Sequence, residues 1–310
     1  MNLTEEILKG NPRAVAKGIS LVENDPRGSR KMMKELFPHS GGSLIVGITG
    51  APGSGKSTLV DQLIGRVTQD KKSVGIIAVD PSSPFSGGAI LGDRIRMMRH
   101  SENPNVFIRS MATRGHLGGL TKATGEAISI LEASGKEFIL IETVGVGQDE
   151  VEVVKMADVI IVVLMPGAGD DIQAFKAGIM EIADVFVINK ADSSETDKTE
   201  RQLRAMLDLG FKDRATPDIV RTVATKGEGI EDLYRSMLAF LSSSGDSNRI
   251  GRKKRLIAWM LKDIINTQIT RQLENHLDPA EFDSLVEQIF RREIDPYSVA
   301  DRIISKLTRI

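Results

Sequence analysis

Residues 44–58 read LIVGITGAPGSGKST, an apolar run that leads into a glycine-rich loop and then into a helical pattern. Gly50, Gly55, Lys56 and Ser57 fit the phosphate-loop pattern G-x-x-x-x-G-K-[ST]. Glycines let backbone N–H groups turn towards phosphates, and the helix N-terminus adds partial positive charge. We expect Lys56 to reach the β- and γ-phosphates and the Ser57 hydroxyl to ligate Mg²⁺. The predicted nucleotide-binding loop consists of Gly50, Ala51, Pro52, Gly53, Ser54, Gly55, Lys56, Ser57 and Thr58.

From residue 44 to about residue 241, apolar β-branched runs alternate with helical patterns. Such runs are typical of parallel strands buried on both faces, so we expect an α/β fold of the P-loop NTPase type with helices on both sides of a mostly parallel sheet. The carboxyl ends of the strands then surround the ligand. The predicted strands are 44–49, 74–80, 106–109, 138–143, 159–165, 184–189 and 219–224.

Helical patterns flank this region on both sides. Residues 3–37 predict helices broken at Asn11-Pro12 and at Asn24-Asp25-Pro26. SSSGDSN, residues 242–248, predicts a polar linker that is followed by a helical pattern of roughly 26 residues and two shorter helices at 279–291 and 296–309. The expected parts are an N-terminal helical extension (1–43), a P-loop domain (44–245) and a C-terminal helical dimerisation domain (246–310).

The long C-terminal helical arm needs a surface to cover its apolar residues. We expect a homodimer through these helices, with packing back onto the chain's own domain as the alternative. The basic run GRKKR, residues 251–255, predicts a solvated helix end in preference to a nucleic-acid patch.

The charge balance excludes several classes of partner. With 41 basic and 42 acidic residues the formal net charge is -1, so no global field favours nucleic acid or an anionic membrane. The absence of cysteine excludes disulfides and thiolate zinc sites and suits a reducing compartment. Without a secretory or transit pattern or a long apolar run, we expect a cytoplasmic protein with no nucleic-acid or membrane partner.

A second motif, Asn189-Lys190-Ala191-Asp192, ends the sixth predicted strand. The Asp192 carboxylate can accept hydrogen bonds from N1–H and N2–H₂ of guanine, a donor pair that adenine lacks, so GTP is favoured over ATP. We expect Asn189 to brace the loop and the Lys190 stem to lie along the base. After the last strand, the small-residue loop at Ala224 is a candidate to present backbone N–H groups to guanine O6.

FILIETVGVGQDE, residues 138–150, places Glu142 at a strand end. P-loop proteins carry a carboxylate near Mg²⁺ at such a position, and the Gly145 backbone N–H can reach the γ-phosphate. The alternative for Glu142 is a structural carboxylate. Val146 stands where small GTPases carry a water-orienting Gln, so we expect slow intrinsic hydrolysis.

Two further carboxylates, Asp80 at a strand end and Asp93 farther on, suit Mg²⁺ through its water ligands, with helix capping and surface charge as alternatives. Gln173 and Lys176, three residues apart, would share one helix face and could deliver a cation to the γ-phosphate. Arg114 and His116 lie on a glycine-bounded loop, and their roles stay open.

Taken together, GAPGSGKST, VDPSSPFSGGAILGDRIRM, RSMATRGHLGGL, ETVGVGQDE, PGAGDDIQAFKAGIMEIAD and NKAD resemble the methylmalonyl-CoA mutase-associated GTPases of the MeaB or MMAA type. The resemblance covers almost the whole chain. It implies a G-protein chaperone of an adenosylcobalamin-dependent acyl-CoA mutase, in which GTP binding and hydrolysis gate cofactor loading and protect the mutase. It also implies that Asp80, Asp93 and Glu142 surround Mg²⁺, and that the partner orders a switch segment carrying Asp170, Gln173 and Lys176.

Two other functions fit the phosphate loop alone. A kinase or ATPase acting on a small substrate is disfavoured by the guanine motif that ends in Asp192. A metallochaperone GTPase for nickel is disfavoured because the chain has no cysteine and only four histidines.

Overall fold

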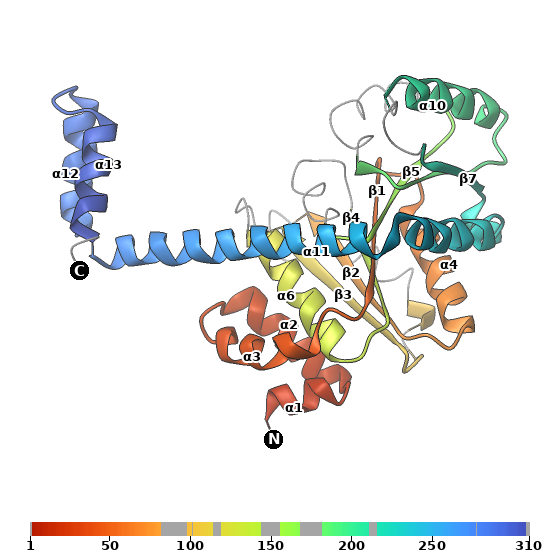
Figure 1. The fold of residues 1–310 in the computed structure, drawn as a ribbon, viewed down its shortest axis with the longest axis horizontal. Helices are drawn as coiled ribbons and strands as arrows, with labels where there is room; N and C mark the ends of the chain where they lie inside the picture. Colours follow the sequence, from red (N-terminus) through yellow and green to blue (C-terminus); the bar gives the residue numbers. More distant parts are fainter. Residues whose placement is uncertain are drawn as a thin grey trace. The chain divides into compact units, whose positions relative to one another are not determined.

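The computed structural model describes residues 2–81, 98–100, 102–113, 119–143, 156–167, 182–210, 216–276 and 278–307. Within these residues, a seven-stranded sheet has the order β3-β2-β4-β1-β5-β6-β7 (Figure 1), and every strand pair is parallel. The strands are β1 (Leu44–Gly50), β2 (Val74–Pro81), β3 (Val106–Thr113), β4 (Phe138–Thr143), β5 (Val159–Leu164), β6 (Val185–Asn189) and β7 (Asp218–Thr222). All seven predicted strands and their parallel arrangement are confirmed, although β3 continues beyond residue 109 to Thr113 and β7 ends earlier because η3 (Ala224–Lys226) follows it.

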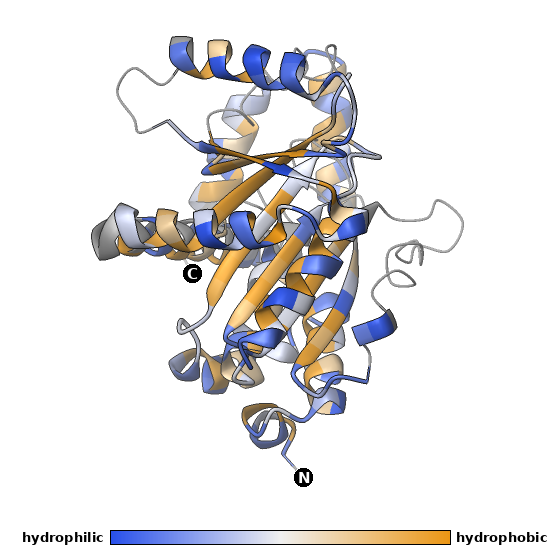
Figure 2. Cartoon of the chain, turned by 90° about the vertical axis from the view of Figure 1, so that its right-hand side faces the viewer, coloured by the Kyte–Doolittle hydropathy of each residue, from blue (hydrophilic) through white to orange (hydrophobic). Residues whose placement is uncertain are grey.

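Helices cover both faces of the sheet, as the apolar runs predict. Val46 and Ile48 of β1 lie in one buried core with side chains of α4 (Lys56–Gln69) and α11 (Ile230–His276). The other face is covered by α6 (Gly119–Ala133), because a Cβ on Gly75 of β2 would lie 2.9 Å from a methyl group of Leu131. Figure 2 shows the hydrophobic residues concentrated in the strands between these helices.

The N-terminal helices form an outer layer on α6 (Figure 1). They are α1 (Leu3–Leu8), α2 (Pro12–Asn24) and α3 (Ser29–Leu36). The predicted break at Asn11 is a helix cap, since its side chain accepts from the backbone N–H groups of Arg13 and Ala14. Pro12 then occupies the first turn, where no intrahelical donor is needed.

The polar linker predicted at 242–248 is wrong, because α11 runs through it without a break for 47 residues. Local serine hydroxyls bond back to the helix: Ser242 Oγ to Leu238 O at 3.0 Å and Ser243 Oγ to Phe240 O at 3.1 Å. Tertiary packing before and after the segment therefore overrides its weak helix propensity.

The prediction that the basic run at 251–255 is a solvated helix end is wrong for Arg252, because its side chain is only 16% exposed. Its guanidinium binds both oxygens of Asp184, each at 2.7 Å, and the Asp158 carbonyl at 2.9 Å. Lys253 Nζ donates to Gly41 O at 2.7 Å. Both cations lie in the middle of α11, so the helix dipole does not oppose them.

The chain divides into two compact units, residues 1–254 and 255–310, and α11 contributes to both. In the second unit, α12 (Pro279–Phe290) and α13 (Pro296–Leu307) confirm the two predicted terminal helices. Large apolar side chains of this unit are exposed, among them Ile257, Leu261, Ile265 and Ile269 on α11. No helix in the described ranges is long and apolar enough to span a membrane.

The remaining elements among the residues that the structure describes are η1 (Phe37–His39), η2 (Met98–His100) and α10 (Thr196–Gly210).

Candidate nucleotide-binding site

The phosphate-loop residues connect the carboxyl end of β1 to the start of α4. Gly50 has φ +150°, and a Cβ there would lie 2.2 Å from the Val163 carbonyl oxygen of β5. Gly55 has φ +90°, and a Cβ there would lie 2.3 Å from Nδ2 of Asn189. Both positions therefore require glycine for conformation and for space, as the motif predicts.

Lys56 is buried at the start of α4 and lies against its own loop. Its ammonium group donates to the carbonyl oxygens of Gly50 at 2.8 Å and Ala51 at 2.9 Å. These bonds hold a buried positive charge at the phosphate loop. The charge would stabilise anionic phosphates bound there by electrostatic attraction and charge-assisted hydrogen bonds. In the same loop Pro52 and Gly53 are exposed, Thr58 is half-buried, and Ser54 is fully buried.

Ser57 and Glu142 lie together beside this loop. The Ser57 hydroxyl donates to Oε1 of Glu142 at 2.6 Å, and both residues are buried. Glu142 lies on β4 between Ile48 of β1 and Ala78 of β2, near the carboxyl ends of all three strands. Asp80 lies two residues beyond Ala78 on β2, so the fold brings its backbone to the same edge.

Asn189 braces the loops around the proposed base position. Its Nδ2 donates to the Ser54 carbonyl at 2.8 Å, while Oδ1 accepts from Thr222 Oγ1 at 3.0 Å and from the Ala224 N–H at 3.1 Å. One buried side chain thus joins the phosphate loop to the loop after β7. The Ala224 N–H is engaged with Asn189, so any contact of that group with guanine O6 would have to share or replace this bond.

The exposed residues of the NKAD motif also have defined partners. Lys190 has φ +58° and its Nζ donates to Gly53 O at 2.8 Å, which adds a second link from this motif to the phosphate loop. The Asp192 carboxylate accepts from Lys226 Nζ at 3.2 Å. Thr222 and Lys226 were missed as partners of the motif, because their signal is only a position beside the last strand.

Several predicted site residues lie outside the described residues. These are Asp93, Arg114, His116, Gly145, Val146, Asp170, Gln173 and Lys176.

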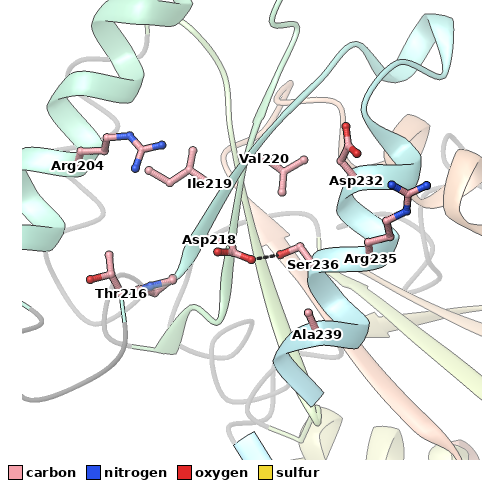
Figure 3. Close-up of a pocket in the computed structure, with 10 residues that line it drawn as sticks. Arg204, Thr216, Asp218, Ile219, Val220, Asp232, Arg235, Ser236 and Ala239 are labelled. Atoms are coloured by element: carbon pink, nitrogen blue, oxygen red, sulfur yellow. Dashed lines mark hydrogen bonds between the residues drawn. The ribbon is translucent and has the colours of Figure 1, made fainter. Parts of the chain in front are cut away.

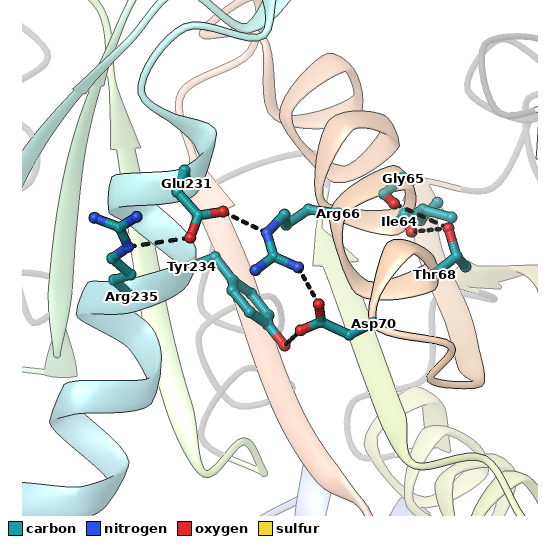
Figure 4. A network of polar contacts seen from close by, with 8 residues as sticks. All are labelled: Ile64, Gly65, Arg66, Thr68, Asp70, Glu231, Tyr234 and Arg235. Carbon is teal, nitrogen blue, oxygen red and sulfur yellow. Dashed lines mark hydrogen bonds and ion pairs between the residues drawn. The ribbon is translucent and has the colours of Figure 1, made fainter.

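A polar network joins α4, which begins at the phosphate loop, to α11, which begins after η3 (Figure 4). Arg66 of α4 binds Glu231 of α11 and lies over the Tyr234 ring, 4.3 Å from its centroid. The Tyr234 hydroxyl donates to Asp70 at 3.0 Å, and burial, aided by that carboxylate, raises the Tyr234 pKa to about 12. The hydrogen bond to Glu231 raises the Arg66 pKa further, so this cation is permanent.

A cavity of about 490 Å³ lies elsewhere, between β7, α10 and α11 (Figure 3). Two arginines and two aspartates line it together with apolar residues of β7, and Asp218 accepts a hydrogen bond from Ser236 at 2.7 Å. None of the predicted site residues lines this cavity.

Comparison with known proteins gives the family. The model described as methylmalonyl Co-A mutase-associated GTPase MeaB matches residues 15–277. A Pyrococcus horikoshii protein named as a GTPase is 48% identical over an alignment of 314 positions, which covers 98% of this chain and 97% of that protein. The mouse protein named methylmalonic aciduria type A homolog, mitochondrial, is 33% identical over an alignment of 320 positions, which covers 96% of this chain and 77% of that protein.

A solved structure supports the fold. The structure named LAO/AO transport system kinase superposes with a TM-score of 0.72 at 23% sequence identity, over 99% of this chain and 96% of that chain. The match of the family model over most of the chain carries the conclusion about function. The chain belongs to the methylmalonyl-CoA mutase-associated GTPase family and is a P-loop GTPase that binds guanine nucleotide.

Proposed function

We propose that this GTPase is a chaperone of an adenosylcobalamin-dependent acyl-CoA mutase, in which GTP binding and hydrolysis gate cofactor loading and protect the mutase. The observation that carries the proposal is the match of a mutase-associated GTPase family model to residues 15–277. The name of the mouse relative, methylmalonic aciduria type A homolog, points to the same metabolism. We further propose a cytoplasmic location for the protein.

We assign the phosphate site to residues 50–58, with Lys56 at the β- and γ-phosphates and the Gly145 N–H at the γ-phosphate. The buried cation of Lys56 between two loop carbonyls supports this assignment, because a phosphate oxygen would replace neutral acceptors with a charged one.

Mg²⁺ fits the oxygen groups beside the phosphate loop. The Ser57 hydroxyl and Glu142 carboxylate are within 2.6 Å of each other, and oxygen donors are the ligands that this ion prefers. We propose that Ser57 and Glu142 hold the ion, with Asp80 and Asp93 acting through its waters. When bound, the ion would neutralise charge on the β- and γ-phosphate oxygens.

We assign guanine recognition to Asp192, braced by the loop contacts of Asn189 and Lys190. The loop at Ala224 completes the base site by holding Asn189. We assign stimulated hydrolysis to Gln173 and Lys176, which a bound mutase would order beside the γ-phosphate.

We also propose a homodimer through the C-terminal helices. Ile257, Leu261, Ile265 and Ile269 recur every fourth residue on α11, which places them along one side of the helix, and each is between 45% and 55% exposed. A second copy of the chain would cover this apolar row.

The test of the chaperone role is GTP hydrolysis by the purified protein, alone and with each adenosylcobalamin-dependent mutase of the source genome. We expect slow turnover alone, stimulation by one mutase, and no turnover of ATP. The variant Lys176→Ala should keep its GTP affinity but lose most of the stimulation, whereas Lys198→Ala, on the exposed part of α10, should not. If no mutase changes the rate, the chaperone proposal fails while the GTPase assignment stands.

A further inference from the structure

One ion pair lies at the proposed base site and has no role in the proposed GTPase and chaperone function. Lys226 of η3 donates to Oδ2 of Asp192 at 3.2 Å. The two side chains are 54% and 51% exposed, so the pair faces solvent. It joins the NKAD loop to the loop after β7 at the carboxylate that we assign to guanine.

The backbones that carry these two side chains are fixed. The Ala191 N–H donates to the Thr222 carbonyl at 3.0 Å, directly before Asp192. The Lys226 N–H donates to the Val223 carbonyl at 2.8 Å, and the bridge between Val223 and Glu228 closes the loop around it. The ion pair therefore has only side-chain freedom to restrict, which lowers the entropy cost of forming it.

A carboxylate has two oxygens and about four lone-pair directions, so it can accept from Lys226 and still accept from guanine. Reading guanine requires both N1–H and N2–H₂ to find acceptors in one plane. A carboxylate that rotates freely satisfies both donors less often than one held by a third partner. Lysine supplies such a hold while leaving the other acceptor directions open.

We propose that Lys226 is a specificity-determining residue that holds the Asp192 carboxylate in the orientation that accepts the guanine 2-amino group. The proposal rests on the assignment of guanine recognition to Asp192. It predicts that Lys226 contributes to discrimination between guanine and hypoxanthine, which lacks the 2-amino group, beyond any contribution to affinity for the phosphates.

The test measures dissociation constants of GDP and IDP for the full-length protein and for Lys226→Met, which keeps the apolar stem and removes the charge. The ratio of the IDP to the GDP constant should fall about two- to fivefold, the range that an exposed ion pair supports. Lys226→Arg should restore most of the ratio, because it can still bind the carboxylate. The matched control is Lys72→Met, since Lys72 forms a similarly exposed pair with Glu137 at the amino ends of β2 and β4.

The outcomes separate this proposal from the one on which it rests. If the unchanged protein prefers GDP and Lys226→Met keeps the full preference, the role of Lys226 is wrong and the role of Asp192 stands. Equal losses of GDP and IDP affinity in Lys226→Met would also overturn the proposal, because its discrimination ratio would be unchanged. If the unchanged protein does not distinguish GDP from IDP, both assignments fail.

Discussion

Lys56, Ser57 and Glu142 meet where β1, β4 and α4 converge, and each side chain has a contact that limits what it can do there. The Lys56 ammonium bonds two carbonyls of its own loop, and the Ser57 hydroxyl bonds Glu142. The sequence motifs predicted these three residues as candidates for the site. They did not predict these partners, because the contacts depend on how the loop closes over the strand beside it.

Glu142→Gln tests the proposed metal role, because it keeps the size of the side chain and removes its charge. We expect the Mg²⁺ concentration for half-maximal GTP hydrolysis to rise about tenfold, while GDP binding in EDTA stays within about twofold of the unchanged protein. Titration of GTP hydrolysis with Mg²⁺ measures the first value, and fluorescence of a labelled GDP measures the second.

Glu137→Gln, just before the amino end of the same strand, is the control for that titration. If Glu142→Gln leaves the Mg²⁺ requirement unchanged, the proposed metal role of Glu142 is wrong. Its hydrogen bond with Ser57 would then be structural only.

At the scale of elements, α11 shows what periodicity can and cannot predict. The apolar pattern of its C-terminal half predicted a helix there, but Ser242, Ser243 and Gly245 indicated a linker. The helix continues because Phe240 and Leu241 pack against the core before this segment and Arg252 binds Asp184 after it. Contacts distant in sequence fix that outcome, so local propensity could not reveal it.

The proposed base site was likewise only partly predictable from the sequence. NKAD identified Asn189, Lys190 and Asp192, because one short motif carries them all. The partners Thr222 on β7 and Ser54 in the phosphate loop lie 33 and 135 residues from Asn189 in the sequence, so they could not be identified from spacing. The strands were predictable because burial on both faces leaves continuous apolar runs.

Arg252→Met should destabilise the protein by about 3 kcal/mol, because it leaves the buried Asp184 carboxylate without its cation. Chemical denaturation measures this loss. Adding Asp184→Asn should recover part of it, since the amide oxygen can still accept from the Ile160 N–H. Arg235→Met, which breaks an exposed pair with Glu231, should cost less than about 1 kcal/mol. Equal effects of the two arginine variants would contradict a special role for the buried pair.

Tyr234→Phe tests the network between α4 and α11. Below pH 10 the variant should be less stable by about 0.5–1.5 kcal/mol, because the hydrogen bond to Asp70 is lost. Burial raises the folded-state pKa of Tyr234 to about 12, so the unfolded chain loses this proton first as the pH rises. Stability from this proton is therefore complete below about pH 10 and declines towards pH 12.

Denaturation midpoints of the unchanged protein and Tyr234→Phe, measured between pH 8 and 12, should differ by a constant amount below about pH 10 and converge above it. A constant difference across this range would show that the hydroxyl does not titrate with folding.

The two compact units differ in how far their large apolar side chains are buried. The unit formed by residues 1–254 buries most of its large apolar side chains in the layers on either side of the sheet, with Phe37 and Ile250 among the exposed ones. In the other unit, Phe290 and Tyr297 are 80% and 82% exposed, in addition to the row on α11. That contrast is the physical basis for the proposed dimer.

Leu261→Glu should convert the protein to a monomer of 33.8 kDa, because a carboxylate in an apolar interface is costly to desolvate. Sedimentation equilibrium gives the mass. Lys262→Glu changes charge at the adjacent exposed position and should leave the dimer intact. A monomeric unchanged protein, or a dimer that tolerates Leu261→Glu, would disprove an interface at this row.

Gly50 and Gly55 set a limit on how far this sequence can vary. A single methyl group at either position would meet an atom of β5 or of Asn189 at 2.2 or 2.3 Å, in a backbone conformation that other residues rarely adopt. In a library that samples every amino acid at each position, even alanine should therefore be rejected at these two sites. Neither glycine contributes a side-chain group to the chemistry, so the strictest demand on the phosphate loop is the space that its neighbours leave.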